Sequence, residues 1–332
     1  MLDQSAPVRV PQLRCPFPSA VHPAAAHLEE SAVAWMRRFG FIRDAAEEEA
    51  ARAAQFGRLA ALTYPHASAE GAQLACDWMI WLFLQDDEYM ERAAEAGRPM
   101  DYARHTLRCL RVLHDPDAPP GEDPYILALH ELCARTRRQI GPEHFQRFVA
   151  GLHEYFTGAG AEVIYLCNRE IPSLQEYIAL RESSIALRSV MFVLLESGMN
   201  CPLPGDRWGS TEIQSLALSA SRVNSWINDI LSGLRELHWP GAINLITVLA
   251  QHHGCAPTEA IGMAVAYHDR ELGAFLDMAE RLRRTSDDPR VGRYLDGLTA
   301  WTRGNQDWSL TCGRYHVDNP DLGVTGPQHF GE

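Results

Sequence analysis

Apolar residues recur along most of the chain at the three- and four-residue spacing of an α-helix. In AAAHLEESAVAWMRRF, Leu28, Ala32, Trp35 and Met36 fall on one face, as in a helix that buries one side against a core. No segment alternates as a half-buried strand does. The same period predicts helices over 24–39, 43–62, 68–96, 101–114, 123–138, 142–167, 173–197, 210–238, 241–253, 257–285 and 288–316. The pattern therefore predicts an all-α protein.

Proline and glycine mark the ends of these segments. Residues 1–23 carry five prolines, which predicts an extended N-terminal arm. The breaks DPDAPPGEDP, CPLPGD and HWPG are short, and neither an internal repeat nor a long linker occurs. We predict one helical domain over 24–317, followed by a flexible C-terminal tail over 318–332.

Composition narrows the class of protein. Of 332 residues, 46% are hydrophobic, which is enough to enclose a large core and a cavity. The net charge is −13 and no basic stripe appears, so we expect no nucleic-acid partner. The densest apolar stretch, WMIWLFL, is too short to span a membrane. The eight cysteines show no metal-binding spacing, so we expect reduced thiols in a cytoplasmic protein.

One polar file interrupts an apolar helix at NDILSGLRE. Asn228, Ser232 and Glu236 are four residues apart, so they share a helix face over two turns. An amide oxygen, a hydroxyl and a carboxylate form a set of hard oxygen ligands of the kind that Mg²⁺ prefers. Taken alone, the spacing also fits an exposed polar stripe.

A second acidic stretch ends the apolar run WLFLQDDEYME. Asp86, Asp87 and Glu91 follow a segment rich in Trp, Leu and Phe. Adjacent carboxylates at the end of a buried helix repel each other unless a cation lies there, although a solvated helix end is the simpler alternative. If both acidic files faced one cavity, they could hold several Mg²⁺ ions, bridged by a diphosphate.

Several segments together resemble the class I terpene synthases (terpene cyclases) of the bacterial type. NDILSGLRE resembles their N-D-x-x-S-x-x-x-E metal motif, and LQDDEYME resembles their aspartate-rich motif. PSLQEYIALRESS resembles the segment with the diphosphate-sensing arginine, and TRGNQDWSLTCGRY resembles the stretch that ends in an Arg-Tyr pair. CPFPSAVHP and YPHASAEGAQLACDWMIWLF also resemble family segments. The resemblance covers about residues 15–316.

The resemblance implies a single α-helical bundle around a deep apolar pocket, with metal ions at its mouth. It also implies a reaction in which three Mg²⁺ ions and basic residues bind a linear prenyl diphosphate. Diphosphate then leaves, and the pocket shapes the cyclisation of an allylic carbocation. Farnesyl diphosphate is the expected substrate. Geranyl and geranylgeranyl diphosphate remain alternatives, and a homodimer is also open.

The motif positions imply roles for individual residues. Asp86, Asn228, Ser232 and Glu236 match metal ligands, with Asp87 and Glu91 as further candidates. The diphosphate-binding candidates are Arg181, Arg235, Arg314 and Tyr315, and the aromatic pocket candidates are Phe83, Trp308 and Phe56.

Two positions depart from the common family pattern. Met90 stands where an acid usually follows the first aspartate, and the acid comes one residue later, at Glu91. Ser184 and Ile185 follow the sensor segment, where many members carry a small residue. Asp87 is therefore an alternative partner for Arg314, and the assignment of the residue whose carbonyl triggers ionisation stays open.

Other functions fit the sequence less well. A trans-prenyltransferase would need a second aspartate-rich motif where NDILSGLRE stands. A zinc hydrolase or a di-iron bundle would need histidine spacings that are absent. A non-catalytic helical scaffold would not explain the two acidic files together with the Arg-Tyr pair, whereas an inactive relative of the family would.

Overall fold

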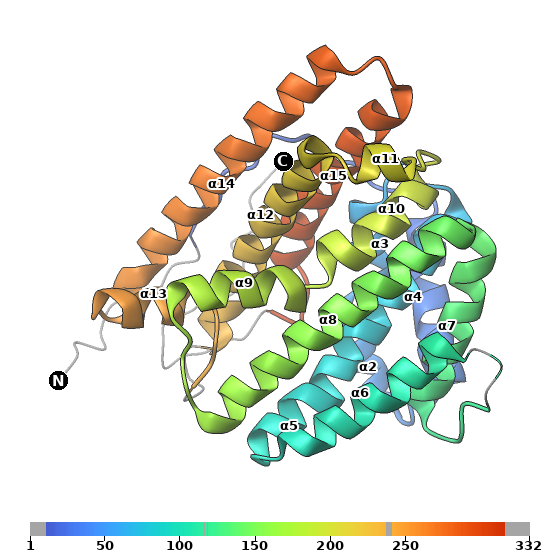
Figure 1. The fold of residues 1–332 in the computed structure, drawn as a ribbon. Helices are drawn as coiled ribbons and strands as arrows, with labels where there is room; N and C mark the ends of the chain where they lie inside the picture. The colour runs from blue at the N-terminus through green and yellow to red at the C-terminus, as the bar shows by residue number, and fades with distance from the viewer. Residues whose placement is uncertain (1–10, 116, 118, 237–240, 316–332) are drawn as a thin grey trace.

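The computed structural model describes residues 11–115, 117, 119–236 and 241–315, apart from the side chains of 234 and 235. Within these residues the regular structure is helical throughout (Figure 1), which confirms the predicted all-α class. None of the helices described has the length and apolar character needed to cross a membrane. Residues 11–23 of the predicted arm are described and form no helix, as predicted for an extended arm. Residues 1–10 and the predicted tail lie outside the described residues, so the predicted domain limits stay a prediction.

The helices follow one another with short connections. In chain order they are α1 (Ala25–Arg38), α2 (Ala45–Ala54), α3 (Phe56–Thr63), α4 (Ala69–Gln85), the π-helical η1 (Asp86–Glu91), α5 (Arg92–Glu95), α6 (Pro99–His114), α7 (Pro124–Ile140), α8 (Pro142–Asn168), α9 (Leu174–Ser184), the π-helical η2 (Leu187–Met191), α10 (Phe192–Gly198), α11 (Gly205–Trp208), α12 (Thr211–Glu236), α13 (Leu245–His253), α14 (Pro257–Thr285) and α15 (Pro289–Ser309).

The helix predicted over 43–62 is two helices, so this prediction was wrong. Gln55 adopts a left-handed conformation, with φ of 53°, which ends α2 and redirects the chain into α3. Most of α2 is exposed, whereas every residue of α3 except Arg58 is buried. Because the two segments face different surroundings, a single straight helix could not satisfy both.

The helix predicted over 173–197 is also interrupted. α9 ends at Ser184, and Ala186 takes a φ of 57° before η2 begins. The predicted helix over 68–96 continues without a turn, but residues 86–91 widen into a π-helical stretch. Such stretches are rare and are frequent at functional sites. All three irregularities lie in or beside segments that border the central cavity.

α8 packs directly on the interruption between α9 and η2. A Cβ atom added at Gly151 would lie 1.8 Å from the Ser189 carbonyl oxygen, and one at Gly158 would lie 2.6 Å from the Ser183 Cβ. Seven residues separate these glycines, so they lie on one face of α8 about two turns apart. The absence of side chains at both positions lets α8 hold the broken segment against the cavity.

This close approach gives a stability prediction. Gly151→Ala should lower the free energy of unfolding by roughly 1–3 kcal/mol, since overpacking forces the backbone apart. Urea unfolding followed by circular dichroism measures it. The matched control is Gly262→Ala on the exposed face of α14, where an added Cβ meets nothing within 4 Å. The control should be neutral or slightly stabilising. Equal effects at the two positions would refute the role of Gly151.

Candidate active site

A cavity of about 580 Å³ lies within the helix bundle. Its wall is built from α3, α4, η1, α5, α8, the α9–η2 interruption, α12, α15 and the chain just after α15. Leu59, Met79, Leu82, Leu187 and Met191 supply part of its apolar surface. Both acidic files predicted from the sequence border this same cavity.

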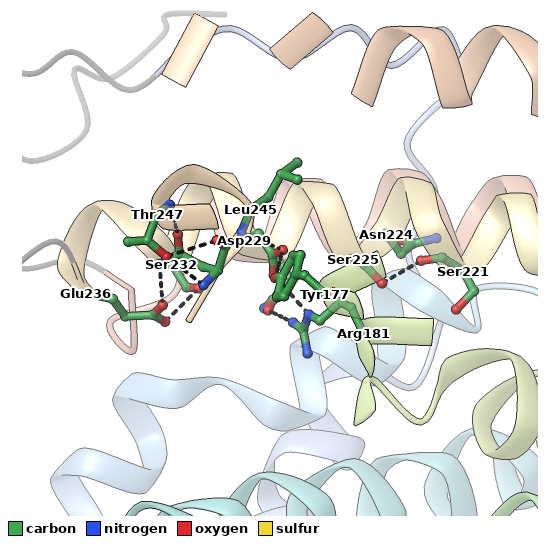
Figure 2. Close-up of polar contacts among 12 residues, drawn as sticks. Tyr177, Arg181, Ser221, Asn224, Ser225, Asp229, Ser232, Glu236, Leu245 and Thr247 are labelled. Carbon is green, nitrogen blue, oxygen red and sulfur yellow. Dashed lines mark hydrogen bonds and ion pairs between the residues drawn. The ribbon is translucent and has the colours of Figure 1, made fainter. Parts of the chain in front are cut away.

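The polar file of α12 forms one side of the cavity. Asn228, Ser232 and Glu236 all border it. Ser232 Oγ donates to Glu236 Oε1 at 3.0 Å (Figure 2). Asn244 Nδ2 donates to Glu236 Oε2 at 2.9 Å. Asn244 is the N-cap of α13, so the start of that helix is tied to the file. Burial raises the pKa of Glu236, while its hydrogen bond from Asn244 opposes the rise.

The acidic stretch of η1 borders the cavity as well, through Asp86, Asp87 and Glu91. Asp86 Oδ1 accepts hydrogen bonds from Tyr155 Oη at 2.6 Å and from Gln85 Nε2 at 2.6 Å. Burial raises the pKa of Asp86 to about 7, and the neighbouring carboxylates add to the rise. One oxygen of this carboxylate is therefore held by the protein.

Arg181 reaches from α9 to the polar file. Its Nε donates to Asp229 Oδ1 at 3.0 Å, and its Nη2 donates to Asn228 Oδ1 at 2.6 Å. Asp229 also accepts from the Tyr177 hydroxyl and from the Leu245 backbone N–H (Figure 2). Because Tyr177 and Arg181 are one turn apart, a single buried carboxylate fixes α9, α12 and the start of α13 together.

The Arg-Tyr pair closes another side of the cavity. Arg314 donates to both oxygens of Asp87, at 2.9 and 2.5 Å, and its guanidinium lies 4.9 Å from the centre of the Phe83 ring. Asn228 Nδ2 donates to Tyr315 Oη at 2.7 Å. The last described residues thus bind to both acidic files.

The predicted aromatic residues occupy two layers. Phe83 borders the cavity. Trp308 is fully buried and donates from Nε1 to the Ala54 carbonyl. Ring centres lie 5.7 Å apart for Phe83 and Trp308 and 5.4 Å apart for Phe83 and Phe56. The structure therefore places Phe56 and Trp308 against Phe83 and not among the residues that border the cavity.

Two further predicted positions need separate mention. Arg235 belongs to α12, but its side chain lies outside the described residues. Ser184 and Ile185 border the cavity together with Ala186. The left-handed Ala186 lets the chain turn there, five residues after Arg181.

Several bordering residues were missed from the sequence. They are Tyr155 and Glu162 of α8, Asp229 and Asn224 of α12, and Trp301 and Asn305 of α15. Asn224 stands four residues before Asn228, so the four-residue spacing could have included it. Tyr155 and Glu162 carried no such signal, since they lie in an ordinary amphipathic helix.

The donor set fits a divalent cation bound by oxygen. Asp86, Glu162 and Glu236 are half-buried carboxyl groups around one cavity, and desolvation raises the pKa of each. A cation would offset their mutual repulsion. Within the described part of the chain, no group of three or more His, Cys, Asp or Glu is arranged to hold a metal. The ligands would therefore be mixed carboxylate, amide and hydroxyl oxygens, which suits Mg²⁺ completed by substrate oxygens and water.

Comparison with known proteins agrees with this geometry. Residues 77–274 match the model of terpene synthase family 2, C-terminal metal binding. The chain is 31% identical to a 4-epi-cubebol synthase ((2E,6E)-farnesyl diphosphate cyclizing) of Streptosporangium roseum, over 93% of each chain. It is 32% identical to a (+)-T-muurolol synthase of Roseiflexus castenholzii, over 90% of this chain and 92% of the relative. It is 28% identical to a germacrene A synthase of Nostoc punctiforme, over 92% and 95%.

Solved structures show the same fold. The SVS_A2 protein from ancestral sequence reconstruction superposes with a TM-score of 0.83 at 26% identity, covering 94% of this chain and 93% of that one. An α-eudesmol synthase gives a TM-score of 0.78 at 23% identity, covering 91% and 99%.

Proposed function

Since the chain belongs to terpene synthase family 2 and is a class I terpene synthase of the bacterial type, we propose that it cyclises farnesyl diphosphate with the help of Mg²⁺. The observation that carries this proposal is that both acidic segments, on η1 and α12, border one largely apolar cavity together with two of the predicted arginines, Arg181 and Arg314. Such a cavity can bind a diphosphate at one end and a hydrocarbon chain along the rest.

The metal-binding residues of this proposal are Asp86 on η1 and Asn228, Ser232 and Glu236 on α12, with Asp87 and Glu91 as further candidates. Three Mg²⁺ ions bound with the substrate would neutralise the diphosphate and make it a better leaving group. The hydrogen bonds from Tyr155 and Gln85 to Asp86 Oδ1 hold that carboxylate in place before any ligand arrives. Asn244 does the same for one oxygen of Glu236.

The diphosphate-binding residues of this proposal are Arg181, Arg235, Arg314 and Tyr315. Arginine donates paired hydrogen bonds to phosphate oxygens. Arg181 is held through Nε by Asp229, so its terminal nitrogens can turn from Asn228 to the diphosphate without loss of the anchor. Arg314 and Tyr315 would close over the bound diphosphate and keep water away from it.

The remainder of the cavity would shape the hydrocarbon chain. Its leucine side chains neither donate protons nor attack a cation, and its methionine side chains donate no protons. Phe83 presents an aromatic ring that stabilises positive charge in a dry site. Phe56 and Trp308 pack against Phe83 and would set its position.

Several relatives carry farnesyl diphosphate in their names as the substrate they cyclise. Geranyl and geranylgeranyl diphosphate are the alternatives. Names of relatives include both alcohols, such as 4-epi-cubebol and T-muurolol, and a hydrocarbon, germacrene A. Similarity to these relatives therefore does not determine the final step of the reaction.

We also propose a cytoplasmic location, consistent with eight free cysteines.

Combined binding of metal and inorganic diphosphate tests the site without turnover. Mg²⁺ and diphosphate together should raise the thermal unfolding midpoint by roughly 3–6 °C, because ligands that bind only the folded state stabilise it. Differential scanning fluorimetry measures the shift, and excess EDTA should abolish it. Mg²⁺ alone and diphosphate alone are the controls, each with little effect. No shift with the combination would contradict the proposal.

A further inference from the structure

Polar groups of the cavity wall extend beyond those assigned to metal and diphosphate. Asn224 on α12 and Asn305 on α15 border the same cavity and are both buried. Asn224 precedes Asn228 by four residues. Along the axis of α12 it therefore lies about one turn, roughly 6 Å, farther from Glu236 than Asn228 does. Both residues therefore belong to the wall of the cavity, beyond the residues assigned to metal and diphosphate.

The amide of Asn224 has a fixed orientation. Its Nδ2 donates to the Ala220 carbonyl at 2.8 Å and to Thr302 Oγ1 at 3.1 Å. Thr302 Oγ1 itself donates to the Leu298 carbonyl, so it is available to Asn224 as an acceptor. A flipped amide would place Oδ1 against these two oxygens. Both amide hydrogens are thus used by the protein, and Oδ1 is directed elsewhere.

Asn224 Oδ1 is buried and has no hydrogen-bond partner among the described residues. A buried acceptor without a partner is destabilising, and buried polar atoms are normally paired with protein or with ordered water. Trp301 Nε1, a donor on a residue that also borders the cavity, is likewise buried and lies next to the Tyr64 hydroxyl.

On α15, the side-chain amide of Asn305 is also held by a hydrogen bond. Asn305 Nδ2 donates to the Asn224 backbone carbonyl at 3.3 Å, which joins α15 to α12 at this level. Trp301 and Asn305 are four residues apart, so they lie on one face of α15. This stretch of wall, formed by Asn224, Trp301 and Asn305, carries amide and indole groups that can accept and donate hydrogen bonds.

We propose that this polar stretch binds one water molecule and that this water ends the cyclisation, so that the product is a terpene alcohol. The inference rests on the proposed function, which supplies the carbocation. A lone pair of the water forms a C–O bond to the cationic carbon. The resulting oxonium then loses a proton to the released diphosphate. Farnesyl diphosphate and water thus give an alcohol and diphosphate without oxidation or reduction.

Isotope labelling tests this step directly. The full-length protein is incubated with Mg²⁺ and farnesyl diphosphate in water labelled with heavy oxygen, and the organic extract is analysed by gas chromatography and mass spectrometry. We expect an alcohol as the main product, carrying the label. Diphosphate release without any oxygenated product would overturn the inference and leave the proposed function standing. If neither farnesyl, geranyl nor geranylgeranyl diphosphate were consumed, the proposed function would fail and the inference with it.

Substitutions test whether Asn224 is the residue that binds this water. Asn224→Leu keeps the approximate volume and should lower the ratio of alcohol to hydrocarbon about tenfold, the equivalent of one neutral hydrogen bond, while diphosphate is still released. Thr302→Val, which removes an acceptor for the Asn224 amide, should lower the ratio in the same direction without changing a residue of the cavity wall. The matched control is Ser225→Ala, a buried neighbour on α12 that hydrogen-bonds to Ser221 and should leave the ratio unchanged. An unchanged ratio in both Asn224→Leu and Thr302→Val would overturn the role of Asn224.

Discussion

Glu236→Gln should reduce turnover of farnesyl diphosphate by at least about 100-fold while the protein stays folded. The expected loss is large because altering even the outer partners of a metal ligand costs roughly 10–100-fold. Gln keeps the size of the side chain and one acceptor oxygen, so the hydrogen bonds with Ser232 and Asn244 need not all be lost. Steady-state release of diphosphate measures turnover, and circular dichroism measures the fold.

Glu212→Gln is the matched control for this change. Glu212 lies in the first turn of α12 and is exposed, so its charge has no part in the cavity. Turnover by this variant should remain within about twofold of the unmodified protein, as for most surface substitutions. If Glu236→Gln were as active as this control, Glu236 would not be a metal ligand.

Arg181→Lys should lower kcat by about 100-fold or more, with a smaller change in KM. Lysine keeps the charge but lacks the forked donors that bind Asp229 and Asn228 together. Removing a single donor to developing negative charge typically costs roughly 10²–10³ in kcat. Pre-steady-state measurement of diphosphate release with saturating Mg²⁺ separates this loss from weaker binding.

The control for charge and location is Arg188→Lys. Arg188 lies seven residues further along, beyond the interruption, and donates to Glu154 and Gln214. It is not among the residues that border the cavity, so its replacement should leave kcat within about threefold, as expected for a partly exposed ion pair. Similar losses for both variants would mean that Arg181 acts on the fold alone.

Helical periodicity predicted most of the elements, because each long helix buries one continuous apolar face. It missed the interruptions at Gln55 and Ala186, since neither residue is the glycine that usually marks a left-handed position. Those breaks depend on tertiary packing. α3 is almost entirely buried whereas α2 is not, and α8 approaches the second break at Gly151 and Gly158. None of these contacts is visible from local spacing.

The candidate site was predictable where its residues lie on one helix. Asn228, Ser232 and Glu236 share a face of α12 by spacing alone, and the structure brings that face to the same cavity as Asp86. Site residues on other helices were harder to predict from the sequence. Trp301 and Trp308 are seven residues apart on α15, but only Trp301 is among the residues bordering the cavity, whereas Trp308 packs against Phe83 and Tyr315. Sequence spacing could not distinguish these two layers.

The central claim is that this cavity converts a linear prenyl diphosphate into a cyclic terpene. The most direct measurement is incubation of the purified protein with Mg²⁺ and, separately, farnesyl, geranyl and geranylgeranyl diphosphate, followed by gas chromatography and mass spectrometry of the organic extract. We expect a cyclic C15 product from farnesyl diphosphate, formed together with inorganic diphosphate and abolished by EDTA. Recovery of all three substrates unchanged from folded protein with Mg²⁺ would contradict it.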